Sequence, residues 1–342
     1  MKLEEFNYYL PQGFIAQRPI KPRDYSRLMI LYRSRKEIEH NTFKSIGDYL
    51  KEGDLLVLNN TKVLPVRIYG IKEKTKGKVE ILLLKSLNDR SWEVLIKPGK
   101  SVHSGIKIIF GPELSGIVKR KDEEKVSYII EFSFIGNFIE ILKKIGQMPT
   151  PPYIKEELKK KDDYQTVYAA QDGSIAAPTA GFHFTKPLLR ELACKGIEIV
   201  YLTLHVGRGT FEPIRASEIE KHKMSSEFYS ISPDVAKKIN RARSERRRIV
   251  SVGTTTTRTL ESACDFNGNR IMSGSRWSDI FIYPGYKFKV VDILITNFHL
   301  PQSTPLLLAA AFAGTEFLLK TYQEAIKENY RFYSFGDAMM IL

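Results

Sequence analysis

A largely apolar run at 197–206 constrains the fold more than any other stretch of the chain. It is too apolar throughout for a strand with one face in water, so it predicts a buried strand. A short helix is predicted just before it, because Thr185 can cap its start, Pro187 suits its first turn and Gly196 can end it. Loop, helix, buried strand and loop in this order are typical of α/β enzymes.

Each loop beside this helix and strand carries a histidine. His183 lies in the motif AGFHFT before the helix, and His205 lies in LHVGRGTF at the end of the strand. Gly207 and Gly209 allow the backbone to turn sharply and to approach a ligand closely. α/β enzymes build pockets at such strand ends, but two ordinary turns with satisfied histidines would give the same pattern. The segment alone leaves both interpretations open.

Polar residues also lie at the ends of three other predicted strands. They are Asn59 and Asn60 after 55–58, Thr254, Thr255, Thr256 and Arg258 after 249–253, and Asn297 and His299 at the end of 291–298. Amides can hydrogen-bond a base or a ribose, and a helix start rich in hydroxyls can bind an anion. Capping of the next turn or helix is the alternative in each case. All four loops could face the same side.

Residues 66–145 show a different pattern of apolar and polar residues from the rest of the chain. Short runs that favour strands alternate there with polar or glycine-rich turns, and they read VRIYG, KVEILLL, WEVLI, IKIIF, SGIVKR and VSYIIEF. The pattern predicts a small all-β barrel inserted into an α/β domain with a mixed or barrel-like sheet. The predicted domains are therefore 66–145 for the barrel, and 1–65 together with 146–342 for the catalytic α/β part.

The net charge of +14 favours a polyanionic partner such as nucleic acid. The barrel contributes sixteen Lys and Arg against ten Asp and Glu, so the basic excess is not confined to one tail. Small basic barrels often bind nucleic acid, although a packing or spacer role is the alternative. A secretory signal and stretches of membrane-spanning length are both missing, which predicts a soluble, cytoplasmic protein that does not associate with a membrane.

Missing motifs disfavour several kinds of site. The two cysteines, Cys194 and Cys264, exclude a disulfide framework and a zinc ribbon, and no HxH or HExxH motif is present. We therefore expect no metal. No GxGxxG follows an early strand, which disfavours a Rossmann dinucleotide site, and no GxSxG elbow occurs. The residues alone predict an α/β enzyme with an anion or nucleotide pocket, without giving its reaction.

Long motifs distributed from end to end resemble those of one known family. They are LPQGFIAQRPIKPRDYSRLMIL, NNTKVLPVRIYG, GQMPTPPYI, YQTVYAAQDGSIAAPTAGFHFT, LTLHVGRGTFEPI, VGTTTTRTLES, WSDIFIYPGYKFKVVDILITNFHLPQSTPLLLAAAFAG and YRFYSFGDAMMIL. In this order they resemble the S-adenosylmethionine:tRNA ribosyltransferase-isomerase family of queuosine biosynthesis. Only the edges of 66–145 take part in the resemblance. Arg208 departs from the family, where a smaller residue is common, and could add a phosphate contact.

The resemblance implies a transferase and isomerase that uses S-adenosylmethionine as co-substrate. The ribosyl part of this donor would pass to a 7-aminomethyl-7-deazaguanine base at the tRNA wobble position, giving epoxyqueuosine with release of adenine and methionine. The family implies no metal and no further cofactor, tRNA and S-adenosylmethionine as partners, and a monomer. A non-catalytic RNA-binding factor and a methyltransferase are the rival functions, and the missing Gly-rich first loop disfavours the second.

The matching motifs also imply roles for single residues. His183 and His205 become the leading acid/base candidates, and His299 is the next. The group from Thr254 to Thr256 with Arg258 resembles a holder for a carboxylate or phosphate, hence for the methionine end of the donor or a tRNA phosphate. The other implied substrate contacts are Asn59, Asn60, Arg67, Asn297, Arg331 and Asp337.

Overall fold

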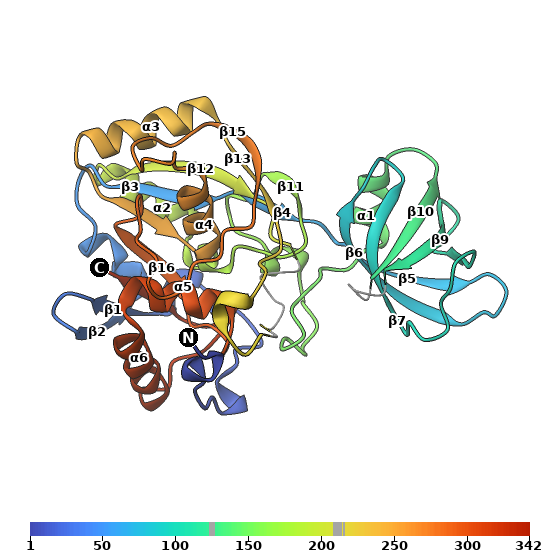
Figure 1. Cartoon of the computed structure of the whole chain (residues 1–342), viewed down its shortest axis with the longest axis horizontal. Helices are drawn as coiled ribbons and strands as arrows, with labels where there is room; N and C mark the ends of the chain where they lie inside the picture. Colours follow the sequence, from blue (N-terminus) through green and yellow to red (C-terminus); the bar gives the residue numbers. More distant parts are fainter. Residues whose placement is uncertain (123–126, 208–213, 215) are drawn as a thin grey trace. The chain divides into compact units, whose positions relative to one another are not determined.

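The computed structural model describes residues 1–122, 127–207, 214 and 216–342. These residues form two compact units, which Figure 1 shows along the chain. The first unit comprises 1–62, 152–171 and 177–342, and the second comprises 63–151 and 172–176. The second unit is therefore inserted into the sequence of the first.

A nine-stranded mixed sheet forms the centre of the first unit, in the order β15-β13-β12-β3-β14-β16-β17-β1-β2. Four neighbouring strands in its middle run parallel, namely β12 (Glu198–Leu204), β3 (Leu55–Asn59), β14 (Ile249–Val252) and β16 (Ile293–Asn297). The remaining strands are β15 (Gly274–Ser278), β13 (Glu227–Ile231), β17 (Ala338–Ile341), β1 (Arg27–Tyr32) and β2 (Glu37–Thr42). Because the four parallel strands end at one edge, the residues that follow them collect there.

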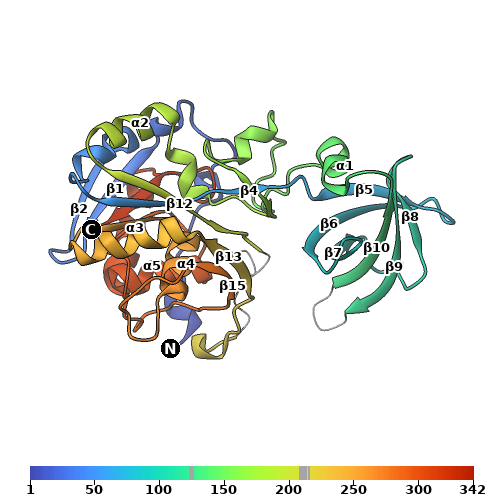
Figure 2. The same ribbon diagram turned by 90° about the horizontal axis from the view of Figure 1, so that it is seen from above.

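Helices cover both faces of this sheet, as the view in Figure 2 shows. On one face lies α2 (Lys186–Cys194), whose leucines join the core formed with the strands. On the other face α3 (Pro233–Ser244) and α4 (Thr254–Ala263) contact β12 and β14, and α5 (Thr304–Ala313) packs between α4 and α6 (Thr315–Lys327). The sheet is thus covered on both faces, as the apolar strand sequences require.

The helix before β12 follows the signals in its sequence. The Thr185 side chain accepts a hydrogen bond from the Leu188 N–H at 3.2 Å, and Pro187 lies in the first turn. Gly196 takes a φ of +80° just after the helix end, a conformation that favours glycine. The helix predicted at this place is confirmed, and it delivers the chain directly into the buried strand.

The second unit is a closed antiparallel barrel with the strand order β10-β7-β6-β5-β8-β9. Its elements are β5 (Arg67–Lys72), β6 (Lys78–Ser86), β7 (Ser91–Lys97), β8 (Lys107–Ile109), β9 (Leu114–Asp122), β10 (Ser127–Phe134) and the helix α1 (Phe138–Ile145). Gly70 and Gly116 are needed inside it, because a Cβ at either position would lie 2.6 Å from a core isoleucine. β4 (Thr61–Val63) and β11 (Gln171–Ser174) form a separate two-stranded sheet. The predicted fold class, an α/β part with a mixed sheet plus a small all-β barrel, is confirmed.

Candidate active site at the ends of the parallel strands

A pocket of about 630 Å³, part of it open to solvent, lies at the carboxyl ends of β12, β14 and β16. Three of the four strand-end loops contribute to its wall, through Val206, through 253–255 and through 296–300. The segments 177–180 and 333–334, together with Tyr153, Ser303 and Pro305, also line it. Its polar side chains include those of Tyr153, Thr179, Thr254, Thr255, Asn297 and His299.

Asn297, the last residue of β16, is held from both ends of its amide. Its Oδ1 accepts a hydrogen bond from the Thr179 hydroxyl at 2.9 Å, and its Nδ2 donates to Nε2 of His183 at 3.0 Å. Nδ2 also lies 3.4 Å from the backbone oxygen of Asp337, which accepts from it. Because both ends are engaged, the amide presents a fixed edge to the pocket.

His183 lies behind Asn297 and not among the described residues that line this pocket. Its ring is 4% exposed and stacks on Phe43 with 4.9 Å between ring centroids. Since the Asn297 amide nitrogen can only donate, Nε2 of His183 accepts, and Nδ1 carries the proton that it donates to Ser26 Oγ at 2.6 Å. The geometry therefore fits a residue that orients Asn297.

Electrostatics supports this interpretation of His183. Burial, followed by the positive charges of Arg331 and Arg23, lowers the pKa of His183 to about 3. Those two arginines and the histidine line a separate cavity of about 210 Å³. At neutral pH the imidazole is uncharged, so it can accept the Asn297 proton continuously.

His299 lies in the pocket wall, and three hydroxyls hold it. Its backbone N–H donates to the Tyr322 hydroxyl at 2.9 Å, and its backbone oxygen accepts a short hydrogen bond from the Tyr8 hydroxyl. The ring Nε2 lies 2.8 Å from Thr296 Oγ1. Burial lowers the pKa of His299 to about 3, so this ring is also neutral at physiological pH.

His205 follows β12 but is not among the described residues that line the pocket, whereas its neighbour Val206 is. Nδ1 of His205 lies 2.7 Å from Thr61 Oγ1, and the ring stacks on Phe228 with centroids 5.7 Å apart. The next part of the LHVGRGTF motif, including Arg208, lies outside the described residues.

The start of α4 forms another part of the wall. Gly253 has a φ of +91°, which lets the chain leave β14 and enter the helix within one residue. Thr254 and Thr255 line the pocket, whereas Thr256 is fully buried and its hydroxyl donates to the Val252 oxygen at 2.6 Å. Of the three predicted anion-binding hydroxyls, the structure brings two to the pocket.

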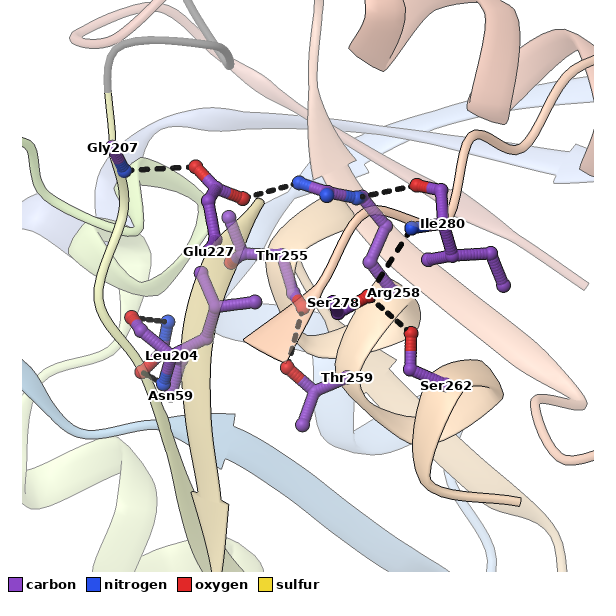
Figure 3. A network of polar contacts seen from close by, with 10 residues as sticks. All are labelled: Asn59, Leu204, Gly207, Glu227, Thr255, Arg258, Thr259, Ser262, Ser278 and Ile280. Carbon is purple, nitrogen blue, oxygen red and sulfur yellow. Dashed lines mark hydrogen bonds and ion pairs between the residues drawn. The ribbon is translucent and has the colours of Figure 1, made fainter. Parts of the chain in front are cut away.

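Arg258 belongs to a buried network (Figure 3), in which its Nη1 makes a short ion pair with Glu227. Nε of Arg258 donates to the Ile280 oxygen at 3.1 Å, and the other Glu227 oxygen accepts from the Gly207 N–H at 2.8 Å. Glu227 and Arg258 are only 2% and 6% exposed, so each neutralises a charge that would be costly alone. This network ties α4 to the backbone that follows β12.

Two aromatic residues pack against each other in the pocket wall. The rings of Tyr153 and Tyr333 lie 4.9 Å apart, and the Tyr153 hydroxyl is 2.7 Å from Ser334 Oγ. Tyr333 adopts a φ of +68°, an unusual backbone conformation for a large residue and one that is found preferentially at functional sites. Burial raises the pKa of Tyr153 to about 12, so both its ring and its hydroxyl stay neutral.

The side chains of Asn59 and Asn60, at the end of β3, hydrogen-bond neighbouring groups of the protein. Asn59 Nδ2 donates to the Leu204 oxygen at 3.0 Å, and Asn59 Oδ1 accepts from the N–H groups of Leu204 and Thr61. Asn60 Oδ1 accepts from the Thr203 hydroxyl at 2.7 Å. Neither asparagine is among the described lining residues of the strand-end pocket. Here the capping alternative describes the side chains better than ligand contact does.

Three predicted substrate contacts lie elsewhere. Asp337 is 2% exposed and accepts from the backbone and guanidinium of Arg331 at 2.8 and 3.2 Å, so this pair organises the C-terminal turn beside the smaller cavity. Arg67 belongs to the barrel unit, where it donates to the Thr150 oxygen at 3.2 Å and pairs with Glu80 at 3.5 Å.

Sequence reasoning missed four residues that shape this site, namely Ser26, Tyr153, Thr179 and Glu227. Each acts through a partner that is distant in the sequence, and although Ser26, Tyr153 and Thr179 stand within matching motifs, no local pattern singles them out. Among the described residues, no cluster of three or more His, Cys, Asp or Glu side chains is placed to hold a metal ion. No helix in the described part of the chain is long and apolar enough to span a membrane.

Comparisons with known proteins give one consistent result. The family model described as "Queuosine biosynthesis protein" matches residues 3–341. Two proteins named S-adenosylmethionine:tRNA ribosyltransferase-isomerase, from Desulfitobacterium hafniense and a Thermoanaerobacter species, are 51% and 52% identical to the chain over 100% of both sequences. A crystal structure of S-adenosylmethionine tRNA ribosyltransferase from Thermotoga maritima is 37% identical, with a TM-score of 0.56, and the match covers 99% of this chain and 100% of that one.

Proposed function

The chain belongs to the queuosine biosynthesis protein family, and we propose that it transfers the ribosyl part of S-adenosylmethionine to tRNA and isomerises it. The acceptor is 7-aminomethyl-7-deazaguanine at the wobble position, and the products are epoxyqueuosine-tRNA, adenine and methionine. The main support for this function is the sequence identity of 51% and 52%, over the full length, to two relatives that are named for this activity.

The chemistry of the donor explains what the pocket must provide. The sulfonium acidifies the neighbouring 5′ carbon of the ribose, so a base can remove a proton there. Elimination of adenine, attack by the aminomethyl nitrogen and closure of the epoxide with loss of methionine follow. A pocket for this sequence needs a neutral proton acceptor, a hydrogen bond to departing adenine, and fixed polar groups around the ribose.

His299 is our first candidate for proton acceptor, because it lines the strand-end pocket and its ring is neutral. A pKa near 3 leaves the ring free to accept a proton but makes it a weak base, so the acidity of the sulfonium-activated carbon must drive the transfer. The same ring cannot act as an imidazolium acid at pH 7, so another group must assist the departure of adenine. His205 remains the second candidate, since the residue beside it lines the pocket. We assign His183 the task of orienting Asn297, whose fixed amide can hold the ribose or the base.

The remaining pocket groups have complementary tasks in this proposal. The rings of Tyr153 and Tyr333 offer an aromatic surface for adenine. Thr254 and Thr255, at the start of α4, offer hydroxyl and backbone N–H groups. Neither task requires a metal or a further cofactor, and none is included in the proposed reaction.

The tRNA partner requires a basic surface, and we propose that the barrel supplies part of it. The barrel sequence has sixteen cations against ten anions. One side of the barrel carries a groove lined by Tyr69, which is 50% exposed, together with Lys76 and Lys78. Exposed aromatic rings among lysines suit an unpaired base and its phosphates. The protein works in the cytoplasm as a monomer, with the domains predicted from the sequence.

Mass analysis of one reaction mixture tests this function. Purified protein, S-adenosylmethionine and tRNA carrying the aminomethyl base should yield adenine, methionine and epoxyqueuosine-tRNA in equal amounts. S-adenosylhomocysteine in place of adenine would identify a methyltransferase instead. Binding of tRNA with no change in either substrate would identify a non-catalytic RNA-binding protein.

A further inference from the structure

Three aromatic side chains form a row across one end of the nine-stranded sheet. They are His205, which directly follows β12, Phe228 on β13, and Trp277 on β15, the strand at the sheet edge. Phe228 lies opposite Trp277 in the pairing of β13 with β15, and the His205 N–H donates to the Phe228 oxygen at 2.9 Å. Neighbouring rings lie 5.7 Å apart at both contacts. These three side chains are called the aromatic row below.

The aromatic row lies on the face of these strands that points away from α4. On the other face, Glu227 of β13 and Ser278 of β15 both bond to side chains of α4 (Figure 3). Because side chains alternate along a strand, the adjacent Phe228 and Trp277 extend from the opposite face. Trp277 is 54% exposed, and His205 and Phe228 are partly exposed. A ligand can therefore reach the row from solvent.

A line of hydroxyl groups runs beside the aromatic row on the same face. Thr203, Ser230 and Ser275 each lie two residues from a member of the row, and the strand register pairs them with one another. The Ser275 hydroxyl donates to Ser230 Oγ at 2.9 Å. Sheets that bind single-stranded RNA stack unpaired bases on aromatic side chains of neighbouring strands. Hydroxyls beside such rings can hydrogen-bond the riboses and phosphates that connect the bases.

We propose that the aromatic row binds an unpaired nucleotide of the tRNA anticodon loop, next to the base that is modified. The location supports this occupant, because His205 adjoins Val206, which lines the strand-end pocket. The net charge of +14 also favours a polyanion over a second copy of the same basic chain. This inference rests on the proposed function and adds to it the tRNA contact nearest to the reaction.

The two ends of the aromatic row differ in how firmly they are held. Nδ1 of His205 lies 2.7 Å from the hydroxyl of Thr61, a fully buried residue, so the inner end is fixed. The outer end, at Trp277, is the most exposed part of the row. Stacking requires only the flat face of a base, which every base has. The row therefore contributes affinity and position, and not recognition of one sequence.

The fluorescence of Trp277 tests the stacking directly. The chain has two tryptophans, so Trp92→Phe leaves Trp277 as the only one. Binding of an anticodon stem-loop to this full-length variant should quench the emission, because a base stacks on the indole. A fully paired RNA duplex should leave the emission unchanged. Unchanged emission while the stem-loop binds, or equal quenching by the duplex, would overturn the proposal.

Substitution of Trp277 measures what the contact contributes. In Trp277→Ala, the affinity for the stem-loop should fall about tenfold and the KM for tRNA should rise by a similar factor, whereas the KM for S-adenosylmethionine should not change. Trp277→Phe keeps a ring and should retain most of the affinity. Phe266→Ala is the matched control, since Phe266 is 96% exposed and lies outside the row. Wild-type affinity in Trp277→Ala, or an equal loss in the control, contradicts the proposal.

Two further measurements separate the aromatic row from its alternatives. Light scattering of the wild type and Trp277→Ala tests whether a second copy of the chain covers the row. A dimer that the substitution converts to a monomer would overturn the proposal, and an unchanged mass supports it. Adenine release by the wild type reports on the reaction independently. Normal release without a response from Trp277 refutes the row alone, whereas absence of release refutes the proposed reaction.

Discussion

The strand-end pocket and the groove on the barrel, which Tyr69, Lys76 and Lys78 line, suit different kinds of ligand. In the pocket, Asn297 is bound at both ends and His299 is held through its backbone and its ring. In the groove, Tyr69 is half exposed, and Lys76 and Lys78 extend into solvent. Fixed, desolvated groups suit a small reacting molecule, because orientation is established before binding. An exposed ring among mobile cations suits a polynucleotide, whose affinity comes from stacking and phosphates.

The largest effect is expected in the pocket, from His299→Ala. Turnover should fall by about 10² to 10⁴, the usual contribution of a positioned acid or base. The tRNA affinity should not change, since the substitution leaves the barrel groove intact. Steady-state turnover and tRNA binding are measured on the same preparation, with Tyr8→Phe as a matched variant that removes only the hydroxyl behind His299. Wild-type turnover in His299→Ala would contradict the proposal that His299 takes part in the reaction in this pocket.

The next effect concerns the rigid support behind the pocket. Because the pKa of His183 is about 3 when folded and ordinarily 6.5, the unfolded chain binds a proton at this ring between these pH values and the folded chain does not. The free energy of unfolding should therefore fall as pH decreases from 6.5 towards 3, and His183 should account for about 2 kcal/mol of the fall by pH 5. Denaturant unfolding of His183→Gln at pH 7 and pH 5 measures this share. An identical pH dependence in the variant would show that His183 titrates normally.

Substitutions in the groove should have a smaller effect, and they should change tRNA binding without changing turnover. The triple variant Tyr69→Ala, Lys76→Ala and Lys78→Ala should weaken binding of an anticodon stem-loop by about tenfold and lower the salt dependence by about two charges. Turnover at saturating tRNA should remain near that of the wild type. Filter binding across a salt series makes the measurement. Lys107→Ala is the control, because that ammonium is already paired with Glu73 at 2.8 Å. If the triple variant binds the stem-loop as the control does, the groove does not take part in tRNA binding.

The smallest effect is expected from Thr185→Ala, which removes the cap of α2 without touching either site. Loss of the hydrogen bond from Leu188, and of the one that the Thr185 hydroxyl donates to Asp24 at 3.0 Å, should cost about 1 to 2 kcal/mol of stability. The KM values for both substrates should be unchanged, and thermal unfolding together with steady-state kinetics measures both quantities. A changed KM would mean that the cap of α2 influences the geometry of the pocket.

Local patterns in the sequence predicted the α/β fold, the barrel and the concentration of polar residues at strand ends. Thr185 caps a helix, and Gly196 and Gly253 adopt the positive φ that their turns require. Both effects depend only on residues nearby in the sequence. The resemblance to the family is confirmed by the match over residues 3–341. Signals of this kind depend on neighbours in the sequence, so a single chain reveals them.

Partners that are distant in the sequence determine whether a polar side chain is already hydrogen-bonded within the protein or can bind a ligand. No local pattern reveals these partners. Asn59 is taken up by the backbone of Leu204, and Arg258 by Glu227. Asn297 lies between His183 and the strand-end pocket, and the ring proton of His183 goes to Ser26, which lies 157 positions away. Without those partners the same side chains would have hydrogen-bonding groups available for a ligand. For this reason we propose His183 as a positioning residue and His299 as the first acid/base candidate.

A crystal structure with S-adenosylhomocysteine would test most directly whether the donor occupies the strand-end pocket. This compound lacks the sulfonium charge and cannot undergo the elimination, so it should remain intact in the crystal. We predict its ribose beside Asn297 and His299 and its adenine against Tyr333. Well-defined density for the ligand in the barrel groove, or in the cavity beside His183, would contradict the account.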